Sequence, residues 1–160
     1  MTANFQLVSP SFRSGDPIPE RHTCDGANVS PALNWHHAPE GTQTLALVVD
    51  DPDARAGTFV HWVLFNLPPE WDVIPEDVRV DEHFENASRV PVEGVNDFGN
   101  LGYSGPCPPA GDSHRYFFRL YALDTVLDLG EGASRQQVEH AIAGHILAEA
   151  DLMGQYARPA

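Results

Sequence analysis

The sequence predicts one mostly β domain, covering residues 1–160, with a single helix near the C-terminus. Prolines and glycines interrupt the chain every ten residues or so, and the short apolar runs between them have the lengths of strands. Only one segment, late in the chain, spaces its apolar residues as a helix does. The chain is 42% hydrophobic and shows no linker between two halves, so it is long enough to bury one core.

Four apolar runs are the expected strands: 4–8, 43–51, 58–68 and 115–124. The strongest is "TFVHWVLFNLP", 58–68, because both of its faces are apolar. Strict alternation gives two faces, with Phe59, Val63 and Phe65 on one and Val60, Trp62 and Leu64 on the other. We therefore expect a central strand that is covered on both sides.

The helix is predicted over residues 134–154. Ser134 followed three residues later by Gln137 is typical of a capping box, which begins a helix. Apolar residues then recur near helical spacing, and Gly154 is expected to end the helix.

Residues 85–113 carry little regular signal. A connection of this length is usually functional or disordered. The prolines and glycine of "GPCPP", 105–109, together with Phe98 and Tyr103, favour an ordered loop. We expect this loop to form one wall of a binding site.

The charge balance narrows the classes of partner. Nine basic residues, all arginine, stand against twenty-three acidic ones, for a net charge of −14. Such a field repels nucleic acid and anionic membranes, and the absence of lysine excludes Schiff-base chemistry. A solvated surface explains the acidity, and a high-salt habitat is the alternative. No apolar run is long enough to span a bilayer and no secretory signal is visible, so a cytoplasmic location is expected.

Polar side chains occur where burial is expected. Asp51 ends an apolar strand, and His61 lies inside a strand that is apolar on both faces. His114 begins another strand, with Tyr116 two residues on and therefore on the same face. If Asp51 approaches His61, the carboxylate would fix one tautomer of the imidazole or keep it protonated.

Together with backbone N–H groups of the 105–109 loop, these side chains predict a small pocket, rich in donors, for an anion such as phosphate or carboxylate. Gly105 would let the backbone approach a ligand closely. The alternative is that each histidine caps a strand or satisfies a buried carbonyl. The combination of two histidines, an aspartate and a stiff loop favours the pocket.

Cys24 and Cys107 are too few for a disulfide framework or a usual zinc site. Three interpretations stay open. The favoured one is a buried structural thiol at Cys107, followed by a redox-dependent bond to Cys24 and, last, a Cys107 nucleophile paired with His114.

No metal site is expected either. Neighbouring residues of "DDPD", 50–53, point to opposite faces of a strand. His36 and His37 are expected on the surface, and His140 and His145 are five residues apart, which is not the spacing of a helical zinc pair.

Several segments also carry a resemblance. They are "CDGANVSPALNW", "DDPDA", "HWVLFNLP", "NDFG", "YSGPCPP", "HRYFFRLYALD" and "GHILAEADLMGQY", in this order. Together they resemble the phosphatidylethanolamine-binding protein (PEBP) family, in its bacterial and archaeal YbhB/YbcL-like branch of Raf kinase inhibitor-like proteins. The similarity runs from about residue 5 to residue 156.

The resemblance implies a PEBP-like fold, in which a large antiparallel sheet packs on a smaller one with peripheral helices. It also implies a pocket that accepts phosphate, acetate, cacodylate or phospholipid headgroup analogues. The family's pocket residues fall here on Asp51, His61, His114 and Tyr116. The Gly-Pro turn that walls the pocket falls on Gly105 and Pro106.

The sequence departs from the family pattern beside this pocket. Arg55 replaces a proline in the Asp-Pro-Asp motif, which is expected to loosen the turn and add a positive charge. Ser104 stands where glycine is common. Asp53 belongs to the motif, and we expect it to stabilise the turn.

A non-catalytic binding module is therefore the favoured function, capturing an anionic group on a metabolite, a headgroup or a protein partner. The resemblance implies an inhibitor or scaffold and suggests a homodimer. No cofactor or metal is expected. The alternative is a phosphoester hydrolase that uses Asp51, His61 and His114 in acid–base work. No nucleophile elbow, metal triad or phosphate-cradling glycine motif supports that alternative.

Overall fold

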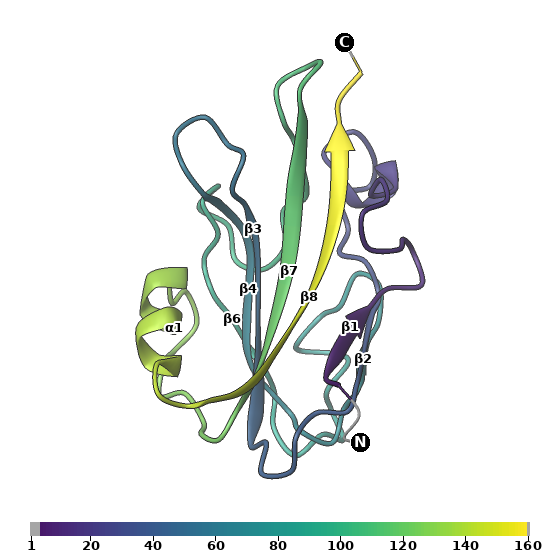
Figure 1. The fold of residues 1–160 in the computed structure, drawn as a ribbon. Coiled ribbons are helices and arrows are strands. Elements are labelled where there is room, and N and C mark those ends of the chain that lie inside the picture. The colour runs from purple at the N-terminus through teal and green to yellow at the C-terminus, as the bar shows by residue number, and fades with distance from the viewer. Residues whose placement is uncertain (1–3, 160) are drawn as a thin grey trace.

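Two antiparallel sheets form the body of the protein in the computed structural model, which describes residues 4–159 (Figure 1). The larger sheet has the order β6-β4-β3-β7-β8, and the smaller has the order β1-β2-β5. The large-sheet strands are β3 (Thr44–Asp51), β4 (Phe59–Leu67), β6 (Val92–Glu93), β7 (Ser113–Leu123) and β8 (Ile146–Ala157). The small-sheet strands are β1 (Gln6–Val8), β2 (Leu33–His36) and β5 (Val73–Ile74). The predicted mostly β fold is confirmed.

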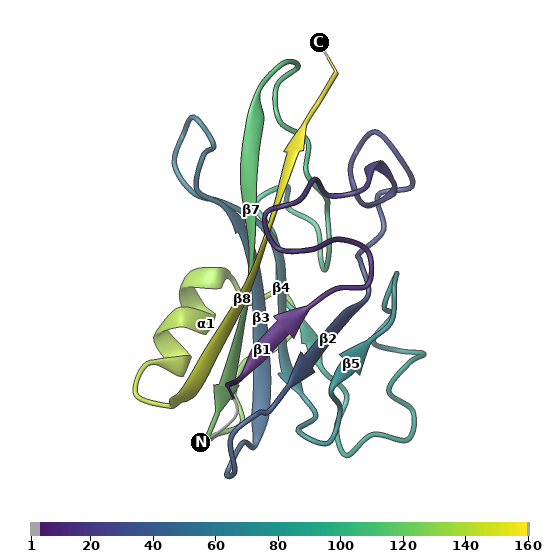
Figure 2. The same cartoon turned by 45° about the vertical axis from the view of Figure 1, so that its right-hand side comes forward.

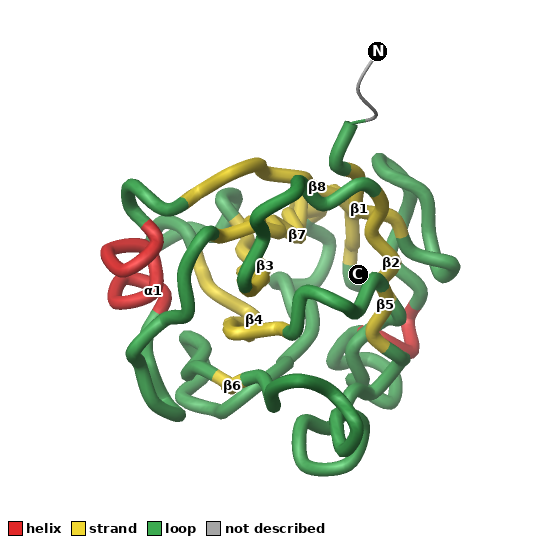
Figure 3. Tube along the Cα trace, turned by 90° about the horizontal axis from the view of Figure 1, so that it is seen from below, coloured by secondary structure: helices red, strands yellow, loops and turns green. Residues whose placement is uncertain are grey.

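The core has two parts because the large sheet is covered on both faces. The small sheet covers one face (Figure 2), and residues such as Trp35 and Leu33 there pack against Leu47 and Leu64. Helix α1 (Arg135–Ile142) lies against the opposite face, as the view from below also shows (Figure 3). Strand β4 is accordingly buried along nearly its whole length, as its two apolar faces predicted.

A β-bulge changes which residues of β4 share a face. Val49 of β3 pairs with Trp62 of β4, but the next residue, Asp50, pairs with Val60. His61 is therefore an extra residue in β4 with no partner in β3. The strict alternation predicted for β4 is therefore wrong at Val60, which packs on the helix side with Val63. Bulges re-aim side chains beside functional sites. Here the bulge leaves His61 on the face of the sheet that carries the intersheet core.

The predicted C-terminal helix is correct at its start and wrong at its end. Ser134 and Gln137 form the capping box, but α1 ends at Ile142. Gly144 has a φ of +82°, and β8 then pairs antiparallel with all of β7. Alanine, glutamate and leucine in 146–152 favour a helix in isolation, whereas pairing with a buried neighbour overrides that propensity.

Three strand ends meet at one end of the large sheet. Asp51 ends β3, Phe59 begins β4 after a short turn, and Ser113 begins β7. Asp51 pairs with Phe59 in β4, and the first residues of β7 extend past the end of β3, whose Asp50 pairs with Phe117. The connection from β6 to β7 runs beside them and contains only one isolated bridge, Val95 to Leu101. None of the helices within residues 4–159 has the length and apolar character needed to cross a membrane.

Candidate functional site

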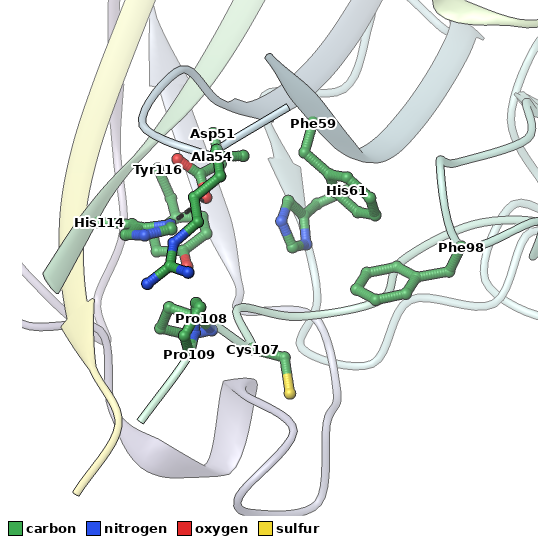
Figure 4. Close-up of a pocket in the computed structure, with 11 residues that line it drawn as sticks. Asp51, Ala54, Phe59, His61, Phe98, Cys107, Pro108, Pro109, His114 and Tyr116 are labelled. Carbon is green, nitrogen blue, oxygen red and sulfur yellow. Dashed lines mark hydrogen bonds and ion pairs between the residues drawn. The ribbon is translucent and has the colours of Figure 1, made fainter. Parts of the chain in front are cut away.

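A cavity of about 210 Å³ opens at this end of the sheet (Figure 4). It is lined by Asp51, Ala54, Arg55, Phe59, His61, Phe98, Cys107, Pro108, Pro109, His114 and Tyr116. The four polar side chains that the sequence singled out, Asp51, His61, His114 and Tyr116, all line it. They come from three adjacent strands, so the sheet register brings them together.

Asp51 pairs with His114 and not with His61, which differs from the sequence expectation. The Nδ1–H of His114 donates to Oδ2 of Asp51 across 2.6 Å, and both side chains are buried. The other carboxylate oxygen accepts the backbone N–H of Asp53 at 2.8 Å. Both oxygens of Asp51 therefore have protein partners, and the pair holds the His114 ring at the cavity wall.

His61 is held by a backbone group. Its Nδ1–H donates to the carbonyl oxygen of Ser104 at 2.7 Å. Burial lowers the pKa of His61 below its ordinary value, and the bond to Ser104 and the charge of Asp51 offset only part of this effect. The ring is therefore neutral at pH 7, with a lone pair on Nε2. The rings of Phe59, Phe98 and Tyr116 surround it, with centroids 5.1, 5.4 and 5.2 Å away.

Tyr116 presents the unsatisfied polar group of the site. Its side chain is 1% exposed, and its hydroxyl has no hydrogen-bond partner among residues 4–159. Burial, with a contribution from the charge of Asp51, raises the pKa of Tyr116, so the hydroxyl keeps its proton and is a donor. A buried hydroxyl without a partner costs about 1–3 kcal/mol. The indole N–H of Trp35 also has no partner among these residues, but it lies in the intersheet core and does not line the cavity.

Of the 105–109 loop, Cys107, Pro108 and Pro109 line the cavity and form its wall. Gly105 and Pro106 do not line it. The N–H of Gly105 donates to the side-chain oxygen of Asn28 at 2.8 Å. A Cβ at position 105 would collide with the carbonyl oxygen of His22. Glycine at 105 is therefore required for packing against the 20–28 segment, whereas the sequence suggested an approach to ligand.

A disulfide joins the wall to that same segment. Cys24 and Cys107 are bonded, with an S–S distance of 2.09 Å, and the N–H of Cys24 donates to the carbonyl of Pro106 at 3.1 Å. The favoured interpretation of Cys107 as a buried free thiol is thus wrong, since Cys107 forms a disulfide and is exposed. A Cys107 nucleophile is excluded while the bond persists. Disulfides persist mainly in oxidising compartments, and inside cells mainly in some hyperthermophiles. The expected cytoplasmic location is not tested by this bond and stays a prediction.

The other aspartates of "DDPD" have structural partners. Asp50 lies on the opposite face and pairs with Arg119 at 2.9 Å. Asp53 accepts two side-chain bonds and one backbone bond from Arg115, each 2.9 Å long. The Arg115 guanidinium lowers the pKa of Asp53 to about 2, consistent with the expected turn-stabilising role. Residues 4–159 contain no cluster of ligands suited to a metal ion.

Phe98 was predicted only as part of the ordered loop, and the sequence did not single it out as a residue that lines the site. Its ring is 47% exposed and meets Phe59 edge-on at 4.7 Å, forming an apolar lip (Figure 4). Buried Asn96 holds this loop: its side-chain oxygen accepts the N–H groups of Phe98 and Asn100, and its amide donates to Ser104 Oγ. The available signal was the "NDFG" segment, which contains both Asn96 and Phe98.

Comparisons with known proteins agree with this architecture. Residues 8–157 match the family model described as phosphatidylethanolamine-binding protein. A UPF0098 protein of Methanothermobacter thermautotrophicus is 50% identical over 157 residues, covering 96% of this chain and 99% of its own. A UPF0098 protein of Aquifex aeolicus is 44% identical, covering 98% and 90%.

Solved structures give the same result. Escherichia coli YbcL, described as a member of the mammalian PEBP family, superposes with a TM-score of 0.88 at 34% identity. The match covers 97% of this chain and 99% of YbcL. A PEBP homologue from Chlamydia trachomatis gives a TM-score of 0.85 at 38% identity, covering 97% and 98%.

Proposed function

Because the chain belongs to the phosphatidylethanolamine-binding protein family, we propose that it binds a small anionic end group, phosphate or carboxylate, in the cavity beside His61, His114 and Tyr116. The observation that carries the proposal is the buried Tyr116 hydroxyl, a donor with no acceptor among the described residues. An anion oxygen at this position would supply the missing acceptor and remove the cost of leaving the donor unpaired.

The two histidines complete the site. Nδ1 of His61 is committed to Ser104, and Nδ1 of His114 is committed to Asp51. Nε2 is therefore the ring nitrogen that each can offer to a ligand. It donates to an anion only when the ring is protonated, so anion binding is coupled to proton uptake. Affinity should therefore rise as the pH falls and a histidine of the site gains a proton.

Several features support binding without turnover. Among the described residues that line the cavity there is no serine or threonine, and the sulfur of Cys107 is in a disulfide. Covalent hydrolysis by a serine, threonine or cysteine nucleophile is therefore unsupported. The hydrolase alternative would depend on a water molecule activated by the Asp51–His114 pair. The ligand can equally be a free metabolite or a phosphorylated group on a headgroup or protein partner, since all share the same anionic end.

Isothermal titration calorimetry with inorganic phosphate and with acetate, at pH 7.5 and pH 6.0, tests the proposal. We expect saturable binding of one anion per chain. Acetate keeps its single charge at both pH values, so it reports the state of the histidines alone, and it should bind more tightly at pH 6.0. Absence of binding, or tighter acetate binding at pH 7.5, would contradict the proposal. A parallel panel of phosphoester and peptide substrates tests for catalysis. Turnover that disappears in His61→Ala would replace the binding function with the hydrolase.

A further inference from the structure

We infer that Arg55 makes the cavity select a doubly charged phosphate over a singly charged carboxylate, by leaving Asp112 and pairing with the bound phosphate. This inference rests on the proposed function and assigns a role to the residue that departs from the family's proline. It concerns a side chain at the rim of the site, distinct from the buried polar residues at its base.

The backbone that carries Arg55 is fixed, while its side chain is not. Asp53 is tied to Asp51 and to Arg115, and the N–H of Gly57 donates to the carbonyl of Ala54 at 3.1 Å. The Arg55 side chain is 80% exposed and lines the cavity. Within residues 4–159 its one ion pair is with Asp112, where Nη2 lies 3.3 Å from Oδ2. The residue is thus placed at the cavity while its guanidinium can turn.

The charges of the cavity explain why Arg55 can discriminate between phosphate and carboxylate. Among the described residues that line the cavity, Asp51 is the one with a carboxylate. His61 is neutral at pH 7, and the Tyr116 hydroxyl keeps its proton. Arg55 is the only lysine or arginine among the described lining residues. A phosphate group carries a charge of about −1.5 to −2, and the buried Asp51 repels it more than it repels a carboxylate. A permanent cation at the rim offsets this repulsion and attracts the dianion more strongly.

The exchange of partners costs little. Asp112 is 40% exposed, and an ion pair between two exposed side chains contributes only about 0–1 kcal/mol. A guanidinium binds phosphate through two parallel hydrogen bonds, and the partly enclosed cavity screens that contact less than open solvent does. Asp112 therefore competes weakly with a phosphate for Arg55, and removal of Asp112 should favour the ligand.

The test compares three variants by calorimetry at pH 7.5, each with inorganic phosphate and with acetate. Arg55→Gln should weaken phosphate binding about tenfold and acetate binding by about threefold or less. Asp112→Asn should tighten phosphate binding about twofold, because it removes the competing carboxylate. Arg89→Gln is the matched control, since it removes one exposed arginine that does not line the cavity. It should change the affinity for either anion by less than twofold.

The outcomes separate this inference from the proposed function. Equal losses of phosphate and acetate affinity in Arg55→Gln, an unchanged phosphate affinity, or no tightening in Asp112→Asn would overturn the role of Arg55. The proposed function would then still stand if Tyr116→Phe weakens phosphate binding. No binding of either anion by the unaltered protein would overturn both. Thermal unfolding of each variant should match the unaltered protein, because Arg55 and Arg89 are exposed and Asp112 is partly exposed.

Discussion

The two sides of the cavity are built in different ways. On one side, Asp51, His61, His114 and Tyr116 project from adjacent strands of the large sheet, where hydrogen-bond register fixes their positions. On the other side, residues 105–109 have no regular secondary structure. They are held to a segment about 80 residues earlier in the chain by a disulfide and by backbone hydrogen bonds. The sheet side is therefore set by pairing between strands, and the wall is set by a few individual contacts.

The largest effect should come from the wall's covalent link. The double variant Cys24→Ala and Cys107→Ala opens a loop of 83 residues, and we expect unfolding to become easier by about 4 kcal/mol. Urea unfolding measures this. The bonds from Tyr103 to His22 and from Gly105 to Asn28 remain, so phosphate affinity should fall by less than about threefold at temperatures where the variant is folded. Loss of all binding by a folded variant would mean that the disulfide alone shapes the wall.

A smaller effect is expected from the close packing behind the wall. In Gly105→Ala the new methyl group meets the His22 carbonyl, so the wall must shift, at a cost of about 1–3 kcal/mol. Gly130→Ala is the matched control, because a Cβ there meets no atom within 4 Å. Urea unfolding should separate the two variants by more than 1 kcal/mol. Equal stabilities would show that this part of the wall is loosely packed.

On the sheet side, Tyr116→Phe should change stability and binding in opposite directions. It removes a buried hydroxyl that has no partner in the described chain, so the free energy of unfolding should rise by about 1 kcal/mol, the lower end of the cost of an unpaired hydroxyl. Phosphate affinity should fall about tenfold, since the donor is lost. Unfolding curves and calorimetry measure the two quantities. A fall in both would mean that the hydroxyl already has an acceptor in the free protein, such as an ordered water.

The smallest effect concerns pH. Burial lowers the pKa of His61 in the folded state, so the unfolded chain takes up the proton first and the fold loses stability as the pH falls below about 6.5. Between pH 7 and pH 6 this loss is at most about 0.7 kcal/mol for one histidine. Buried His22 has a lowered pKa for the same reason and adds a loss of the same sign.

The variant His61→Asn isolates the His61 contribution, because an asparagine amide can replace Nδ1–H as the donor to Ser104. Between pH 7 and pH 6, the free energy of unfolding of this variant should fall by up to about 0.7 kcal/mol less than that of the unaltered protein. His36→Asn, at an exposed position, is the control and should leave this fall unchanged. Saturating phosphate should also flatten the curve of the unaltered protein. An unchanged pH dependence in His61→Asn would show that His61 titrates normally in the folded state.

The same contrast explains which features sequence reasoning could find. His61 and Tyr116 are polar residues within strongly apolar strands, and that local pattern was sufficient to mark them. The partner of Asp51 could not be read in this way, because β3 has β4 on one side and β7 on the other. The bulge at His61 and the bond from His61 to Ser104 leave His114 as the partner of Asp51.

The sequence by itself determined the fold class, the family, and the four polar side chains that meet at the cavity, because each depends on local periodicity or on motifs contiguous along the chain. Tertiary structure decided the Cys24–Cys107 bond, the conversion of 146–157 into an edge strand, and which residues of the 105–109 loop face the cavity. These features depend on contacts between segments that are distant in sequence. Such contacts outweigh local propensity, and no short stretch of residues encodes them.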